Sequence, residues 1–376
     1  MVNSPPNQPS PDIENSSLPS HSADDRRIPL IYVLPSSDMY GTERMALATA
    51  EGLTDDYRII FLGYLGPAIF EARKLGFETR EFQSTPQMIK LFFRVLREFG
   101  SLTFVSTLPR YTKYFLALNF FMRRKVRMIH MIHGGGYESV DYAGLRRLNK
   151  VDVTFVAVSE YGRQRLIHHG IRADHTAVVG NFMIRRQLDA MPRRPRFERD
   201  GVRKVAVVAR VDPPKRVDLL LDALDRCGDA MRDVSFRVLG WGPDLDRLSA
   251  RAAKSHPNVV FAGYVDNVPE ELAAADLLVH TCAVETFGMA VLEAMSVNLP
   301  TLVPDAAGTA MLVRDGETGF KYRPEDADDL ARKLMELKNA PAELLNRIAQ
   351  AAQLDCATRF SQDESIRQYR QIFAPR

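Results

Sequence analysis

Cysteine and tryptophan are both scarce in this sequence, with three cysteines and one tryptophan in 376 residues. Three cysteines are too few for a disulfide framework, and their spacing matches no zinc-binding motif. Such sparing use of cysteine is typical of a reducing compartment, which predicts a cytoplasmic protein. The three are Cys227, Cys282 and Cys356.

Long apolar runs are also missing. No stretch reaches the roughly 18 uninterrupted apolar residues of a membrane-spanning helix. The longest candidate, residues 111–122, contains Lys113 and Asn119. The N-terminus has no basic start followed by an apolar segment, so it does not resemble a secretory signal. We therefore expect a soluble protein, or one bound peripherally to the inner face of a membrane.

An excess of one charge is nearly absent as well, since 50 basic residues face 47 acidic ones and the net charge is +3. The hydrophobic content of 45% supports ordinary packed cores, and 22 glycines and 22 prolines exclude collagen-like and wholly disordered chains. The length suggests two domains. Residues 1–27, rich in Pro, Ser, Asn and Asp, cannot bury enough apolar surface to offset their ordering entropy, and we predict a disordered tail there.

From Ile28 onward, short runs rich in β-branched residues alternate with helical patterns. Such alternation predicts an α/β protein with parallel sheets covered by helices on both faces. The Pro- and Arg-rich residues 191–201 are the predicted linker between two Rossmann-like domains that face each other across a cleft. Their predicted bounds are 28–190, for acceptor binding, and 202–355, for nucleotide-sugar binding, with a C-terminal helix in 356–376 that packs back on the first domain. Ligands of such sheets bind at the carboxyl ends of the strands.

The segment ETFGMAVLE carries two glutamates, Glu285 and Glu293. In one continuous helix, steps of about 100° would leave them about 80° apart, without a shared stripe. We place Glu285 in the loop after a strand at 276–282 and start a helix one or two residues later, where Gly288 lets the backbone approach a ligand. The N–H groups at that helix start suit a phosphate, with Glu285 beside a sugar and Glu293 near a ribose. The plainer alternative is an unrelated loop acid and helix acid.

Two cations follow the first strand of the second series. Arg210 ends the strand expected at 203–211, and Lys215 stands just before the next helix. Cations that converge on one loop can neutralise a diphosphate, and Arg210 offers a bidentate fork; exposed charges on a loop are the alternative. Gly240 belongs to a Gly-x-Gly turn that lacks the third glycine of a dinucleotide fingerprint but suits a tight turn near a base or phosphate.

The first series carries weaker signals in two loops. Gly41 stands at a predicted helix start, where the backbone can hold a diphosphate or an acceptor group. His133 ends a strand beside three glycines, and a histidine at the mouth of a cleft can bind a sugar hydroxyl or move a proton; a structural histidine is the alternative. His130 lies deeper on the same strand face and is interpreted as structural.

Taken in order, these motifs resemble those of the family 4 glycosyltransferases, which are retaining, nucleotide-sugar-dependent enzymes of the two-domain GT-B fold. The resemblance covers about residues 28–360 and depends on the order and spacing of motifs that are each loose. In the second half they are VARVDPPKRVDLLLDAL, LGWGPDLDRL, VVFAGYV, ETFGMAVLE, AMSVNLPTLV and RDGETGF. In the first half they are YGTERMALATAEGL, the His-Gly pair at 133–134, VAVSEYGRQRL and VVGNF.

The resemblance implies that two cations bind the donor diphosphate, Glu285 contacts the donor sugar and Glu293 binds the ribose. The implied donor-binding set is Arg210, Lys215, Gly240, Glu285, Phe287, Gly288, Met289 and Glu293. The implied catalytic set is Glu285, His133, Arg210 and Lys215, and Gly41 would lie at the phosphate or acceptor face. No metal or other cofactor is implied, because cations and helix termini take the place of a divalent ion.

Three places depart from the family pattern. Tyr40 stands where the first of two glycines is common, which predicts a narrower acceptor mouth. Ala307 and Met311 replace a glycine and a glutamate, which leaves sugar or base selectivity open. Asn298 replaces a glycine, at a position where asparagine tolerates left-handed geometry.

We therefore predict a retaining transferase that moves a hexose-type unit from a nucleoside diphosphate sugar to a glycan or lipid-linked glycan, as in cell-surface polysaccharide assembly. The leaving diphosphate, stabilised by Arg210 and Lys215, would accept the acceptor's proton on the same face. A nucleotide-sugar epimerase of the same fold is one alternative, although no acid/base set for it can be located. A catalytically silent nucleotide-sugar-binding module is another, although it would be expected to have lost Glu285 or a cation.

The small net charge conceals a polarised distribution. Residues 86–127 hold nine basic residues against Glu98 alone, a local charge of +8, and they are also rich in Phe and Tyr. Basic residues interleaved with apolar ones at helical spacing are typical of a helix on an anionic surface. Three interpretations stay open: docking to an anionic membrane, binding of a polyanionic acceptor, and a core-packed helix with a solvated basic face. Nucleic acid is not expected, because no recognition motif accompanies the patch.

Overall fold

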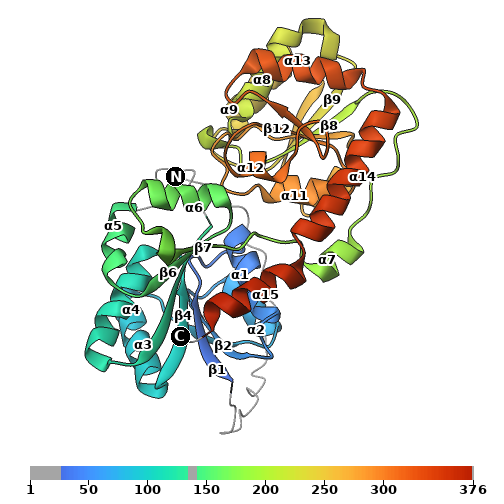
Figure 1. Ribbon diagram of the computed structural model, residues 1–376. Coiled ribbons are helices and arrows are strands. Elements are labelled where there is room, and N and C mark those ends of the chain that lie inside the picture. Colours follow the sequence, from blue (N-terminus) through green and yellow to red (C-terminus); the bar gives the residue numbers. More distant parts are fainter. Residues whose placement is uncertain (1–26, 134–141, 375–376) are drawn as a thin grey trace.

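The computed structural model describes residues 27–133 and 142–374. The predicted disordered tail therefore lies outside the described residues except for Arg27, as do the glycines after His133. The described chain forms two α/β domains, each built on its own parallel sheet (Figure 1), which confirms the predicted fold class. No helix within these two stretches combines the length and hydropathy needed to cross a bilayer.

The N-terminal sheet has the strand order β3-β2-β1-β4-β5-β6-β7, with every neighbour pair parallel. The order reverses between β1 and β4, and the loops after these strands flank the point where ligands of such sheets bind. The strands are β1 (Ile28–Val33), β2 (Tyr57–Gly63), β3 (Glu78–Glu81), β4 (Ser101–Ser106), β5 (Lys125–Ile132), β6 (Val153–Ala157) and β7 (Thr176–Val178).

Helices cover both faces of this sheet, because alternate side chains of β1 and β2 feed two separate cores. One core contains α1 (Gly41–Glu51), α2 (Pro67–Lys74) and the C-terminal α15 (Gln362–Phe373). The other contains α3 (Thr85–Glu98), α4 (Pro109–Met122) and α5 (Tyr142–Arg146). The chain then adds α6 (Glu160–His168) and α7 (Arg185–Ala190), with short 3₁₀ turns at η1 (Arg147–Lys150) and η2 (Ala173–His175).

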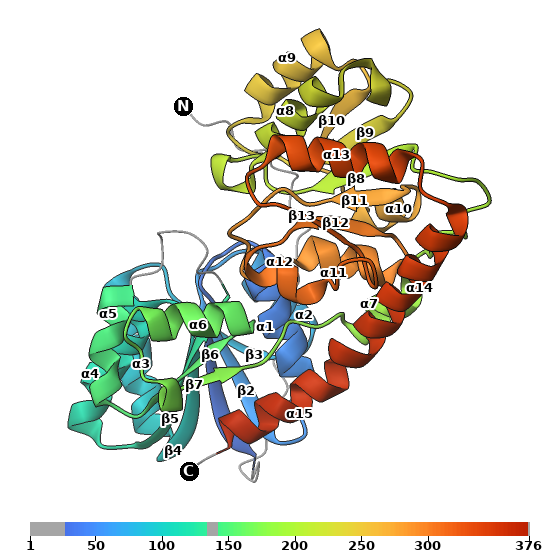
Figure 2. The ribbon, with the colours of Figure 1, turned by 45° about the horizontal axis from the view of Figure 1, so that its top comes forward.

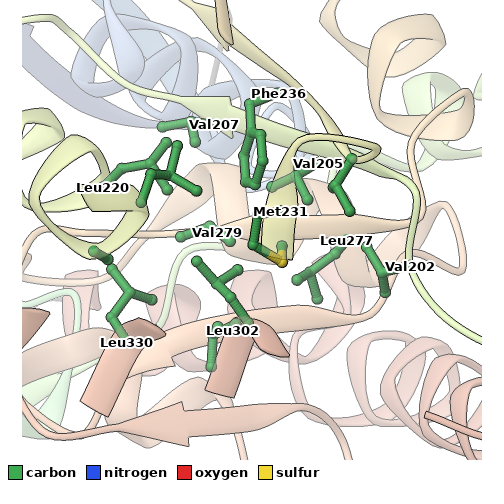
Figure 3. Packing of buried hydrophobic residues seen from close by; sticks show 14 of the residues in the cluster. Val202, Val205, Val207, Leu220, Met231, Phe236, Leu277, Val279, Leu302 and Leu330 are labelled. Atoms are coloured by element: carbon green, nitrogen blue, oxygen red, sulfur yellow. The ribbon is translucent and has the colours of Figure 1, made fainter. Parts of the chain in front are cut away.

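The C-terminal sheet has the order β10-β9-β8-β11-β12-β13, again wholly parallel. Its core is mostly aliphatic, with Val205, Val207, Leu277 and Leu302 packed around Phe236 and against helix residues (Figure 3). The strands are β8 (Lys204–Val208), β9 (Ser235–Leu239), β10 (Val259–Gly263), β11 (Leu277–Val279), β12 (Thr301–Pro304) and β13 (Phe320–Tyr322). The helices are η3 (Pro213–Lys215), α8 (Val217–Cys227), η4 (Gly228–Met231), α9 (Leu245–Ser255), α10 (Val268–Ala273), α11 (Met289–Ser296), α12 (Ala307–Leu312), α13 (Ala327–Lys338) and α14 (Ala342–Arg359).

The segment between the domains packs against the C-terminal domain. Arg194 is buried there, where its Nε donates to the carbonyl of Ala275 at 2.7 Å and its Nη2 pairs with Asp276 at 2.6 Å. The guanidinium also lies over the ring of Phe197, 3.4 Å from its centroid. These contacts fix the interdomain segment against the C-terminal domain.

The chain returns to the N-terminal domain through α14 and α15 (Figure 2). Ile366, Tyr369 and Phe373 on α15 join the core beneath α1 and α2. Thr103 of β4 donates a 3.1 Å hydrogen bond to the carbonyl of Phe373, and Arg370 pairs with Asp56 at 2.7 Å. The last helix therefore ties the two domains together.

Candidate functional site

The clearest contact between predicted site residues joins Lys215 and Glu285. Their strands, β8 and β11, are neighbours in the sheet, so the loops at the carboxyl ends lie together. The Lys215 ammonium forms an ion pair with Oε2 of Glu285, and both side chains are mostly buried, at 17% and 20% exposure. Thr281 in the loop after β11 donates a 2.6 Å hydrogen bond to the Lys215 carbonyl and fixes its backbone.

This pairing also governs the ionisation of Glu285. Burial raises its pKa, but the charge of Lys215 and a hydrogen bond from Lys215 act against burial, and the pKa is lowered. His280 is itself buried, and burial lowers its pKa to about 4. At neutral pH the site therefore holds a carboxylate against an ammonium, beside an uncharged imidazole.

Arg210 lies in the loop and not in the strand, because β8 ends at Val208. Its side chain is 65% exposed and pairs with Asp212, to which Nε donates at 2.6 Å. Among the contacts of the described residues, none joins Arg210 directly to Lys215 or Glu285. Asp212 is buried, but a guanidinium has five N–H donors, so Arg210 can contact a diphosphate with its exposed N–H groups while it stays bonded to Asp212.

The expected helix start one or two residues after Glu285 is wrong: α11 begins at Met289. Gly288 has φ 102° and ψ 63°, a left-handed conformation that residues other than glycine rarely adopt, so the helix cannot extend before it. A Cβ at Gly288 would also lie 2.7 Å from Cγ2 of Thr309. The glycine is thus needed both for the turn and for the close approach of α12.

The loop 285–288 is held by backbone contacts from two sides. The N–H of Gly308 in α12 donates to the carbonyl of Glu285 at 2.7 Å. From the other domain, the hydroxyl of Ser159 donates to the carbonyl of Thr286 at 2.6 Å. The same hydroxyl accepts the N–H of Gly162 and so caps α6. The loop is preorganised, and α6 of the N-terminal domain takes part in holding it.

The side chains of the two residues next to Gly288 pack in the protein interior. Phe287 is 4% exposed and meets Phe360 edge to face, with ring centroids 5.9 Å apart. Met289 packs between the cores of the two domains. Only the backbone groups of these residues are therefore left for a ligand.

Glu293 lies on the first turns of α11, facing the N-terminal domain. Burial raises its pKa to about 7, and the charge of Arg44 on α1 opposes that rise across the domain boundary. A carboxyl group with such a pKa changes charge near neutrality, which an exposed glutamate does not.

Gly240 allows two loops to lie side by side. Its φ is 141°, and a Cβ there would lie 1.9 Å from the carbonyl oxygen of Ala209, next to Arg210. A hydrogen bond also joins the two loops, since the N–H of Val211 donates to the carbonyl of Trp241 at 3.1 Å. Trp241 is 51% exposed and therefore sits beside the loop that carries Arg210.

In the N-terminal domain, Gly41 begins α1, and a Cβ added there would meet nothing within 4 Å. The fold does not require glycine at this position, so its absence of a side chain leaves open space at the start of the helix. Tyr40 just before it is 64% exposed.

Sequence reasoning missed Glu43, which is 1% exposed. Burial raises its pKa, while hydrogen bonds from the backbone N–H groups of Glu43, Tyr40 and Ser36 oppose the rise. A glutamate three residues after the N-cap residue, here Tyr40, that reaches back to the N-cap N–H is one half of a capping box, and that spacing was the available signal. The acid shapes the loop in front of Gly41.

His133 directly follows β5 and is the last residue described before the gap. It is half-buried, and burial lowers its pKa to about 4. His130 is fully buried, with Nδ1 2.8 Å from the hydroxyl of Thr112, in keeping with a structural role.

One group of residues has the donor types of a metal site. The ligating atoms of His280, Cys282 and Glu285 all lie within 4.8 Å of one another. A nitrogen, a sulfur and a carboxylate are ligands that suit Zn²⁺. Because Glu285 is also the partner of Lys215, a cation bound there would compete with the ammonium.

Two departures from the family pattern have backbone consequences. Asn298 has φ 65°, so the prediction of left-handed geometry is confirmed. Ala307, at φ 54°, occupies the same region at the start of α12, where an alanine is strained by roughly 1 kcal/mol relative to glycine.

Comparison with known proteins finds relatives over part of the chain. Residues 192–355 match the family described as "Glycosyl transferases group 1". The chain is 32% identical over 197 residues to a GDP-mannose-dependent alpha-mannosyltransferase of Mycobacterium tuberculosis, covering 50% of each protein. It is 28% identical over 195 residues to a phosphatidyl-myo-inositol mannosyltransferase of the same species, covering 50% of this chain and 49% of that protein. The chain thus spans about half the length of these curated relatives.

The fold is shared with solved structures over nearly the whole chain. Anabaena Alr3699/HepE in complex with UDP-glucose superposes with a TM-score of 0.75 at 20% identity, covering 92% of this chain and 99% of that one. The structure of TarM gives a TM-score of 0.75 at 13% identity, covering 93% and 99%. These likenesses establish the two-domain architecture.

Proposed function

We propose that this chain, whose residues 192–355 match the group 1 glycosyltransferase family, transfers a sugar from a nucleoside diphosphate sugar to a hydroxyl acceptor. The transfer retains the configuration at the anomeric carbon, as the resemblance to family 4 implies. The acceptor is a glycan or lipid-linked glycan, and residues 86–127 present a surface to an anionic membrane. The relatives named as mannosyltransferases and the neighbour that binds UDP-glucose support a nucleotide-sugar donor.

The observation that carries the proposal is the buried Lys215–Glu285 pair at the carboxyl ends of β8 and β11. A lysine and a glutamate held in a mostly buried site, beside an exposed arginine, suit a substrate that is anionic at one end and rich in hydroxyls at the other. The diphosphate would contact Lys215 and Arg210, and the sugar hydroxyls would donate to Glu285.

The same residues account for the chemistry. As the bond from the anomeric carbon to the diphosphate oxygen breaks, negative charge develops on that oxygen, where Lys215, Arg210 and the N–H groups after Gly288 stabilise it. The acceptor hydroxyl attacks from the same face and gives its proton to the departing diphosphate. His133 lines the acceptor side as a neutral donor or acceptor of hydrogen bonds, since its pKa is lowered to about 4.

We propose that no divalent ion is needed for this reaction. Two cationic side chains and the start of α11 supply the positive potential that a metal would otherwise provide. Turnover should accordingly be unchanged after treatment with a chelator and dialysis. The silent-module and epimerase alternatives are judged by the same assay, because neither releases a diphosphate in proportion to acceptor.

The test is incubation of the full chain with a panel of nucleoside diphosphate sugars and hydroxyl acceptors. We expect release of nucleoside diphosphate and a new glycosidic bond with one donor, and NMR of the product should show the donor's anomeric configuration. Release of diphosphate without a glycoside product, or no release with any pair, would contradict the proposal.

A pH dependence follows from Glu293. Its pKa is raised from 4.5 to about 7, so the carboxylate that accepts the ribose hydroxyls is lost as the pH falls through 7. We expect the affinity for the nucleoside diphosphate sugar to fall as the pH drops from 8 to 6, by up to about tenfold per pH unit below the pKa. Glu293→Gln should bind with an affinity that no longer changes over this range. A wild-type affinity that is flat across it would refute the role of Glu293, because the diphosphate of the sugar donor does not titrate there.

A further inference from the structure

The outer side of α3 and α4 forms one continuous surface of aromatic and basic side chains. The two helices pack side by side on the face of the N-terminal sheet opposite α1, α2 and α15 (Figures 1 and 2). The exposed residues of α3 recur at intervals of three and four, and therefore share one side of the helix. We call the exposed set the aromatic–basic face; it comprises Lys90, Phe93, Arg94, Arg97, Arg110, Tyr114, Phe120, Phe121, Arg123 and Lys125.

The strongest feature of this face is a pair of phenylalanines in the last turn of α4. Phe120 is 76% exposed and Phe121 is 80% exposed, with ring centroids 5.4 Å apart. The core does not lack aromatic rings here, because Phe115 on the inner side of α4 stacks on Phe104 at 3.7 Å. The fold is complete without the exposed pair, and adjacent exposed rings of this size point to a partner.

The positive charge of the face favours a negatively charged partner. The single acidic residue of 86–127, Glu98, is engaged by Arg80 through two hydrogen bonds of 2.6 and 2.9 Å. Some of the nine basic residues contact other groups of the protein: Arg110 donates to the hydroxyl of Tyr111, Arg124 to the carbonyl of Leu96, and Arg127 to that of Ile372. On α3, the guanidinium of Arg97 lies 6.0 Å from the centroid of the exposed Phe93 ring.

The shape of the face favours a bilayer over a soluble polyanion. The cations line the outer side of two parallel helices and do not converge on one point, as they would around a phosphate group. Phe120 and Phe121 gain little from a sulfated or phosphorylated glycan, whereas they can enter the boundary between headgroups and acyl chains. Lysine and arginine beside an anionic leaflet contribute about 1 kcal/mol each.

The face also adjoins the side where an acceptor would enter. Because α3 and α4 run antiparallel to the strands, their first turns lie at the carboxyl edge of the sheet. A hollow at this edge is lined by Leu108, Pro109, Arg110, Lys113 and Tyr114, and a second by residues that include Gln83, Gln87, Lys90 and Arg94. The basic residues of the face thus continue to the rim of the acceptor domain.

We propose that the aromatic–basic face docks the N-terminal domain on an anionic lipid bilayer, with Phe120 and Phe121 inserted at the interface. A lipid-linked acceptor then stays in the bilayer while its head group reaches the carboxyl edge of the sheet. This last step depends on the proposed transfer of a sugar to the acceptor; the docking does not.

The test is co-sedimentation of the full chain with vesicles of phosphatidylcholine alone or mixed with phosphatidylglycerol. We expect binding to the anionic vesicles only, and weaker binding as salt is raised. Phe120→Ser/Phe121→Ser should lower the binding constant at least tenfold, as should Arg97→Gln/Lys125→Gln. Phe70→Ser, on the 48% exposed Phe70 of α2 at the opposite face, is the matched control and should bind like the wild type.

The outcomes separate the docking from the proposed function. The variants should keep wild-type turnover on a water-soluble acceptor, since none of these residues lies in the donor site. Loss of vesicle binding in the variants with no glycosyl transfer by any form would refute the transferase and leave the docking intact. The docking would be overturned if the protein bound neutral and anionic vesicles alike, or if the phenylalanine variant bound as well as the wild type. It would also be overturned if the protein bound heparin but not vesicles, or if it formed a dimer that the phenylalanine variant abolished.

Discussion

Lys215→Ala is expected to reduce turnover by about 100- to 1,000-fold, the usual loss when one preorganised donor to developing negative charge is removed. Two effects combine in this variant. The leaving diphosphate loses a cation, and Glu285 loses the partner that lowers its pKa against the effect of burial. Glu285→Ala should likewise abolish most turnover. The check is steady-state release of nucleoside diphosphate at saturating donor, together with the melting temperature of each variant.

A matched control separates catalysis from folding. Lys338 is also a lysine of the C-terminal domain with 19% exposure and a carboxylate partner, Asp233, but it lies at the end of α13. Lys338→Ala should keep wild-type turnover. In Lys215→Ala/Glu285→Gln the buried charge is removed along with its partner, so this variant should regain stability without regaining activity. Recovery of turnover along with stability would show that the pair is only structural.

Gly240→Ala is expected to weaken donor binding even if residue 240 makes no contact with the donor. A Cβ at residue 240 would lie 1.9 Å from the carbonyl oxygen of Ala209, and φ 141° is unfavourable for alanine. Overpacking costs about 1–3 kcal/mol, and backbone strain adds about 1–3 kcal/mol. The loop carrying Arg210 and Lys215 must shift to relieve the clash, so donor affinity should fall together with stability.

Gly316→Ala is the control for this prediction. Gly316 also has positive φ, at 71°, but a Cβ there would meet nothing within 4 Å. It should lose about 1 kcal/mol of unfolding free energy, measured by denaturant titration, and keep its donor affinity. Equal losses of stability and affinity in the two variants would show that the Ala209 contact has no special role.

The alternation of strand and helix patterns was enough to predict two parallel α/β domains, because a strand buried on both faces and an amphipathic helix have distinct periods. The sequence also placed Lys215 and Glu285 in loops that follow strands of one parallel sheet, although their ion pair was not predicted. These predictions use only local pattern and a general rule about strand ends.

What could not be predicted depends on contacts between distant residues. The start of α11 is displaced to Met289 by the left-handed backbone of Gly288. A glycine permits this conformation, but its presence in the sequence does not predict it. The hydrogen bond from Ser159 to Thr286 spans 127 residues and joins two domains, and no local pattern contains it. The pairing of Arg210 with Asp212 and the burial of Glu43 likewise become visible only with the backbone in place.

The central claim is that the loops carrying Arg210, Lys215 and Glu285 form one nucleoside diphosphate site. The sequence has a single tryptophan, Trp241, whose carbonyl accepts the N–H of Val211 in the arginine loop. Intrinsic fluorescence therefore reports directly on this site. Titration with nucleoside diphosphates should change the emission saturably for at least one base, with an affinity at least tenfold weaker in Lys215→Ala. Binding detected by calorimetry with unchanged emission, or equal affinity in the two proteins, would contradict the account.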